Sequence, residues 1–175
     1  GMLDDITHIN ELIEALLLLT AAGRGTGSGG TVLRIDEIIF QAVDLVSKQY
    51  PDLHVELSVD EKIMQSEEYL TVIAQRSWLE IVFSNLLRNA YLYSTDKTVG
   101  VSFGINDQGT YIDIVNNGIT LSEEEQHKLF KPFMRGSNAH HVKGLGIGLT
   151  IVNRVLSALG FHISYTASTN VNIFR

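Results

Sequence analysis

Apolar residues recur along the chain with two different periods, and the change of period separates expected helices from expected strands. Spacings of three and four residues predict helices with one apolar face at 4–20, 36–50, 77–94 and 148–160. Alternation of apolar and polar residues predicts strands at 53–59, 99–105 and 110–115, with two short ones at 162–168 and 170–174. This order predicts an α+β fold, a two-layer sandwich in which a mixed sheet of about five strands is covered by about three helices.

Polar and glycine residues mark where these elements should begin and end. Asp36 and Ser77 are the expected N-caps of the helices that they open. Ser122 and Glu125 have the spacing of a capping box, which predicts a further helix at 122–130. Gly160 is expected to close the last helix, and "NDQG" at 106–109 should join two strands as a hairpin.

A glycine-rich segment divides the chain into two unequal parts. Residues 23–31 contain five glycines and are expected to form a linker. Residues 1–22 before it carry an amphipathic helix with a wide apolar stripe, which reads as an appendage. Residues 32–175 are the expected globular domain.

Composition excludes several classes of function. At 45% hydrophobic residues the chain can bury a core, so wholesale disorder is excluded. The net charge of −7 argues against a nucleic-acid partner. The chain has no cysteine, hence no disulfide framework, and no apolar run of the roughly 18 residues that a membrane helix needs. We therefore expect no direct membrane contact.

Asn85 and Asn89 lie four residues apart in the helix predicted at 77–94, at the edge of its apolar stripe. Leu79, Val82, Phe83, Leu86 and Ala90 form the face that should pack on the sheet. Amide oxygens suit Mg²⁺, which takes few protein ligands and keeps several waters. Taken alone, the pair is better explained by asparagines that hydrogen-bond a neighbouring loop.

Two further segments could contact a nucleotide. "KGLGIGL" at 143–149 sets Gly144, Gly146 and Gly148 before a helix, where backbone N–H groups can approach a phosphate. On its own this pattern fits a flexible loop equally well. Asn116 and Gly118 follow the strand at 110–115, where a side chain could recognise a base, although an Asn-Gly turn is the simpler explanation.

The order of these segments resembles the ATP-binding domain of sensor histidine kinases, in the Bergerat-fold superfamily of gyrase, mismatch-repair ATPases and large heat-shock chaperones. "SNLLRNAYLYS" resembles the asparagine box and "NNGITL" the first glycine box. "LFKPFMRG" resembles the phenylalanine box and "GLGIGLTIV" the second glycine box. The resemblance covers roughly residues 33–175. The helix before the linker is similar to the last helix of that family's dimerisation domain.

The resemblance implies roles for the residues of the first two boxes. Asn85 would coordinate Mg²⁺ that bridges the ATP phosphates, and Asn89 would contact the nucleotide and its phosphates. Tyr93 matches the aromatic residue that lines the adenine pocket. Asn116 would accept a hydrogen bond from the adenine amino group, and Gly118 would lie beside it.

The resemblance also implies a lid over the nucleotide at about residues 122–143. Phe130 and Phe133 would anchor this lid, and Arg135 would be its cation near the terminal phosphate, as a catalytic residue together with Asn85. The flexible end of the lid would approach the phosphates through its glycines, Gly144, Gly146 and Gly148.

Four positions depart from the common pattern of the family. Ile81 stands where a polar residue often polarises the attacking group, and Leu92 stands where a basic residue often binds phosphate. Asn116 replaces an aspartate, so its amide oxygen can accept a hydrogen bond without the charge. Thr120 replaces a glycine of the same box. Ile81 and Leu92 put the rate of catalysis in question more than nucleotide binding.

The function that the resemblance implies is transfer of the γ-phosphoryl of ATP, with Mg²⁺, to a histidine outside this chain, in a cytoplasmic domain of a parent protein that can be membrane-anchored. No histidine here has the phosphoacceptor pattern. The implied partners are the phosphoacceptor helix of the parent, a second copy of the parent in a homodimer, and a response regulator. Two alternatives stay open: an anti-sigma-factor-type serine kinase, and a degenerate nucleotide-binding module that acts as a docking platform.

Overall fold

The computed structural model describes Ile13 and residues 30–139 and 146–175. The rest of the predicted N-terminal helix, most of the linker, and Gly144 lie outside these ranges. The elements are β1 (Thr31–Arg34), α2 (Ile35–Gln49), β2 (His54–Val59), α3 (Glu61–Met64), η1 (Glu67–Leu70), β3 (Thr71–Ala74), α4 (Arg76–Tyr93), β4 (Thr98–Asn106), β5 (Gly109–Asn117), α5 (Glu123–Gln126), η2 (Ser137–Ala139), α6 (Gly148–Ala158), β6 (Tyr165–Ser168) and β7 (Val171–Phe174).

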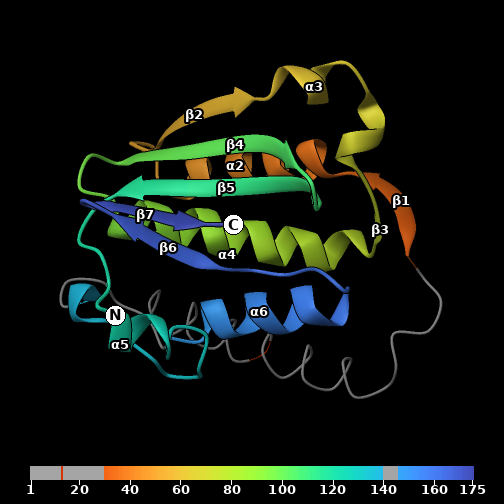
Figure 1. Ribbon diagram of the computed structural model, residues 1–175. Coiled ribbons are helices and arrows are strands. Elements are labelled where there is room, and N and C mark those ends of the chain that lie inside the picture. The colour runs from red at the N-terminus through yellow and green to blue at the C-terminus, as the bar shows by residue number, and fades with distance from the viewer. Residues whose placement is uncertain (1–12, 14–29, 140–145) are drawn as a thin grey trace.

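The main sheet has five strands in the order β2-β4-β5-β7-β6. β2 runs parallel to β4, and the other neighbours are antiparallel, so the sheet is mixed. In the helical layer α4 packs between α2 and α6 and contacts β4 and β5 (Figure 1). The predicted α+β sandwich is confirmed.

The core forms between α4 and the central strands. All five predicted sheet-facing residues of α4 are buried, from Leu79 to Ala90. They meet side chains such as Val101 of β4 and Ile114 of β5, which are also almost fully buried. Burial of a large aliphatic side chain contributes about 1.5–3 kcal/mol, so this face fixes α4 against the sheet.

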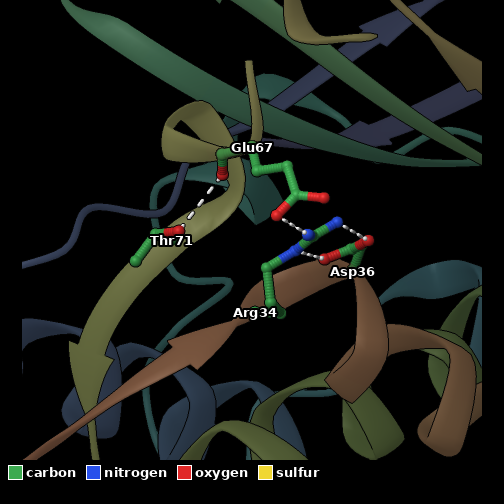
Figure 2. A network of polar contacts seen from close by, with 4 residues as sticks. All are labelled: Arg34, Asp36, Glu67 and Thr71. Atoms are coloured by element: carbon green, nitrogen blue, oxygen red, sulfur yellow. Dashed lines mark hydrogen bonds and ion pairs between the residues drawn. The ribbon is translucent and has the colours of Figure 1, made fainter.

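A second, two-stranded sheet was not predicted. β1 pairs antiparallel with β3, and an ionic network fastens its edge to α2 and η1 (Figure 2). The Arg34 guanidinium donates to both carboxylate oxygens of Asp36, at 3.0 and 2.8 Å, and lies 2.9 Å from the Glu67 carboxylate. The Thr71 hydroxyl donates to the Glu67 carbonyl at 3.1 Å.

This network explains one wrong prediction. Asp36 is not the N-cap of α2, because its carboxylate is taken by Arg34, which itself occupies the N-cap position without a side-chain cap. Ser77 is also not an N-cap, since α4 begins one residue earlier and Gln75 precedes it. The chain enters both helices from β1 and β3, whose pairing sets the starting points.

Other predicted ends are confirmed. The Ser122 hydroxyl accepts from the Glu125 N–H at 3.4 Å, and the Glu125 carboxylate accepts from the Ser122 N–H at 2.8 Å, which completes the capping box. α5 is nevertheless shorter than predicted, because the backbone bonds after His127, beginning with Lys128 N–H to the Glu125 carbonyl, span three residues instead of four. Gly160, at φ +78°, ends the turn after α6 as predicted.

Candidate nucleotide-binding site

Asn85 faces the N-terminus of α6 from the middle of α4. The residue is 8% exposed, and its Nδ2 donates to the Ile81 carbonyl at 2.9 Å. This bond points Oδ1 away from the helix backbone, toward Gly148: a Cβ placed on Gly148 would lie 2.9 Å from that oxygen. Asn89 lies one turn further along α4 and is half-buried. An uncharged oxygen therefore stands beside a helix N-terminus.

The glycine segment before α6 packs against residues of the predicted lid. Gly146 has φ +70°, and a Cβ there would approach the Met134 carbonyl to 2.5 Å. The Phe133 N–H donates to the Gly146 carbonyl at 3.1 Å. Glycine at this position is required both by the backbone conformation and by the closeness of the lid.

Tyr93 and Asn116 are brought together where α4 and β5 end. A Cβ on Gly118 would lie 2.2 Å from the Tyr93 carbonyl, so the backbone leaving β5 touches the end of α4. Asn116 is only 2% exposed and lies on the same face of β5 as the buried Ile114. Its Nδ2 donates to the Asn117 carbonyl at 3.4 Å, and its Oδ1 is the acceptor end of the same amide.

Asn117 points to the opposite face, as alternation along the strand requires. It is exposed, and its Nδ2 donates to the Asp96 carboxylate at 2.8 Å. This bond, with others from Ser94 and the Thr98 N–H, lowers the pKa of Asp96 to about 2. Asn117 therefore ties β5 to the loop after α4 and is turned away from Asn116.

Sequence reasoning missed the buried Asn172, which lies beside Asn116, and the half-buried Tyr165 that bonds to it. Asn172 of β7 is the register partner of Asn116, and its Oδ1 accepts from the Tyr165 hydroxyl at 2.6 Å. That hydroxyl also accepts from the Leu121 N–H at 3.2 Å, so the pair holds the start of the lid. Burial raises the pKa of Tyr165, which stays a neutral donor. Only the strand register, which is non-local, could have placed these residues here.

Arg135 lies over the glycine segment and acts on Tyr93. Its Nη2 donates to the Ala139 carbonyl at 2.9 Å, and its Cγ would lie 3.2 Å from a Cβ on Gly146. Burial raises the pKa of Tyr93, and the positive charge of Arg135 opposes that rise. Arg135, the predicted lid cation, is therefore close to Tyr93, the aromatic residue predicted to line the adenine pocket.

Only one of the two predicted lid anchors is even partly buried. Phe130 packs against the core, whereas Phe133 is 69% exposed and its predicted anchoring role is wrong. The reason is its backbone: Phe133 has φ +61° and its N–H is bound to Gly146, which turns the ring to the surface.

The arrangement suits a nucleoside triphosphate with its metal. Polar acceptors lie at both ends, Asn116 for a base and Asn85 for a cation, with glycines and the N-terminus of α6 for phosphates. The residues that the structure describes include no cluster of three or more histidine, aspartate or glutamate side chains able to hold a metal. A cation here would take its other ligands from phosphate and water, as Mg²⁺ commonly does.

Comparison with known sequences identifies the class. The profile described as "Histidine kinase-, DNA gyrase B-, and HSP90-like ATPase" matches residues 74–173, more than half of the chain. The chain belongs to this family and is an ATP-binding domain. The matched range includes Asn85, Asn116 and Gly148.

The relatives that match are sensor histidine kinases. Sensor histidine kinase HprS of Escherichia coli is 28% identical over 100% of this chain and 37% of its own length. Sensor histidine kinase ArsS of Helicobacter pylori is 27% identical over 90% of this chain and 34% of its own. The chain thus spans well under half the length of these relatives.

Solved structures show the same fold. The mycobacterial sensor histidine kinase MprB superposes with a TM-score of 0.71 over 82% of this chain and 94% of that structure, at 24% identity. Full-length ShkA in complex with AMPPNP superposes with a TM-score of 0.74 over 98% of this chain and 35% of that structure, at 18% identity.

No helix in the described ranges is both long and apolar enough to cross a membrane.

Proposed function

We propose that this chain is the catalytic domain of a two-component sensor histidine kinase, which binds ATP·Mg²⁺ and donates the γ-phosphoryl to a histidine on the phosphoacceptor helix of its parent. The observation that supports this most is the position of the Asn85 Oδ1, which faces the glycine-lined start of α6. In the reaction the bond between the β and γ phosphates breaks, a phosphorus–nitrogen bond forms, the imidazole loses a proton and ADP leaves.

The residues of the chain act mainly by positioning, which supplies most of the catalysis in phosphoryl transfer. Asn116 and Tyr93 would hold the adenine, and Gly118, where a Cβ would collide with the Tyr93 carbonyl, would keep the two residues close together. Asn85 would hold Mg²⁺, which neutralises charge on the phosphates when bound. Asn89, Arg135 and the glycines Gly144, Gly146 and Gly148 would contact the phosphates.

The parent would act as a dimer. Residues 1–22 would contribute the last helix of the dimerisation domain, which packs in a four-helix bundle with the phosphoacceptor helix and their copies. Residues 23–31 would let the ATP-binding domain reach that helix. The phosphohistidine would then pass its phosphoryl group to a response regulator.

Phosphotransfer tests this proposal directly. The chain, mixed with the separately produced phosphoacceptor domain of its parent and labelled ATP·Mg²⁺, is expected to label that domain on an acid-labile, base-stable site. Acid-stable label would favour the serine kinase instead. ATP binding without any transfer would favour the docking module. Ile81 and Leu92 are the reason to test for it, because apolar residues stand there in place of polar and basic ones.

Asn116→Asp is expected to tighten ATP binding up to roughly tenfold while leaving GTP binding weak. A hydrogen bond to a charged group is worth about 1.5–3 kcal/mol, against about 0.5–1.5 for a neutral one. Guanine presents a carbonyl where adenine has its amino group, so the carboxylate gains nothing from it. Competition binding of ATP and GTP measures the difference.

The control for this variant must avoid Asp96. Asn117→Asp would set two carboxylates at the distance of the present 2.8 Å bond and destabilise the loop, so Asn117→Ser is the better control. Asn117→Ser should leave both affinities unchanged. If Asn117 proves the position that controls base preference, Asn116 does not contact the adenine.

A further inference from the structure

Arg88 donates to the oxygen on which the proposed metal site depends. Its Nη2 lies 3.0 Å from the Asn85 Oδ1, one helical turn away on the same face of α4. The family resemblance implies no role for this arginine. It is half-buried, so its charge acts in a partly water-excluded place.

The direction of this bond limits what can bind. A divalent cation at the Asn85 Oδ1 would meet the guanidinium charge at close range, and the two charges repel. An anion bound at the start of α6, beside the close contact between Asn85 and Gly148, would meet the same guanidinium as a donor. A phosphate is the anion that fits best, because the planar fork of arginine donates to two of its oxygens at once.

The position of Arg88 on α4 also favours contact with phosphate. Ile81, Arg88 and Leu92 lie along one stripe of the helix, seven and four residues apart. Arg88 is the charged side chain on that stripe, between two apolar ones. It can therefore supply, one turn earlier, the positive charge that Leu92 lacks.

We propose that Arg88 is a phosphate-binding residue of the nucleotide site, which rests on Asn85 in the free protein and moves to the ATP phosphates as Mg²⁺ reaches the Asn85 Oδ1. This inference rests on the proposed binding of ATP·Mg²⁺. The bond to Asn85 keeps the guanidinium positioned beside the phosphate site, and its release makes metal and nucleotide binding depend on each other.

Arg88→Met tests the proposal, because methionine keeps the helix and the aliphatic stem and removes the charge. Calorimetric titration with adenosine, ADP and ATP, each with Mg²⁺, is expected to show ATP bound roughly tenfold more weakly and adenosine unchanged. Arg88→Lys keeps the charge and should recover part of the loss. Arg154→Met, which changes an exposed arginine on α6, is the matched control and should bind all three ligands as the native chain does.

Relocation of the charge gives a second measurement. In the Arg88→Met background, Leu92→Arg should restore ATP affinity, since the cation returns to the same stripe. Equal ATP affinity in the native chain and Arg88→Met would overturn the inference, as would an equal loss for adenosine, which indicates a structural role. A native chain that binds no ATP·Mg²⁺ would instead overturn the proposed function itself.

Discussion

Asn85→Ala is expected to weaken ATP·Mg²⁺ binding about hundredfold or more and to leave the fold intact. Loss of a group that only orients a metal ligand commonly costs 10–100-fold, so loss of the ligand itself should cost at least the upper value. The helix tolerates alanine well, and within the described ranges the substitution removes the bonds to Ile81 and Arg88. Calorimetric titration with ATP in Mg²⁺ or in chelator measures the loss.

Adenosine is the matched ligand for this variant. It has no phosphates, so its affinity depends on the base end of the site and should match that of the native chain. Circular dichroism should show the same helix content and a similar melting temperature. Unchanged ATP·Mg²⁺ affinity in Asn85→Ala would show that Asn85 does not coordinate the metal, whatever else the chain binds.

Gly118→Ala is expected to destabilise the domain and to impair adenine binding together. The new Cβ would lie 2.2 Å from the Tyr93 carbonyl, so the end of β5 and the end of α4 must separate. Overpacking of this kind costs typically 1–3 kcal/mol. The same separation moves Tyr93 relative to Asn116. Denaturant unfolding and adenosine titration of one sample measure both effects.

Gly100→Ala is the control for that prediction. Gly100 lies in β4, and a Cβ there would meet Val115 at 3.4 Å, an ordinary contact. This variant should retain adenosine affinity and native stability within about 1 kcal/mol. A Gly118→Ala protein that is as stable as Gly100→Ala and binds adenosine equally well would contradict the close approach of α4 and β5.

The elements that could be predicted from the sequence are those whose pattern of apolar and polar residues lies within one short segment. The face of α4 from Leu79 to Ala90 repeats with the helical period, and the hairpin of β4 and β5 follows from alternation around one turn. The strands β1 and β3 have four residues each and pair across about forty residues of sequence, so no local pattern distinguishes them. Because β1 and β3 pair, α2 begins at Ile35 and α4 at Arg76, and neither helix is capped by Asp36 or Ser77 as predicted.

The same division holds for the candidate site. Asn85, Asn116 and the glycines before α6 could be predicted because they occur in recognisable short segments. Arg88 lies in the same asparagine box as Asn85, but the sequence does not indicate that it binds phosphate. That inference needs the structure, in which Arg88 donates to the Asn85 Oδ1 and this oxygen faces Gly148. Asn172 and Tyr165 depend on which strand lies beside β5, and the exposure of Phe133 depends on a backbone bond to Gly146.

The most direct test of the account is the location of the bound metal. Mn²⁺ can replace Mg²⁺ in a complex with ATP, and its unpaired electrons broaden the nuclear magnetic resonance signals of nearby groups. If Asn85 holds the metal, Mn²⁺·ATP will broaden the side-chain amide of Asn85 and the backbone amide of Gly148 first, and Mg²⁺·ATP will not. Sharp signals at both groups, with broadening instead around β1 and β3 or the outer face of α2, would contradict it.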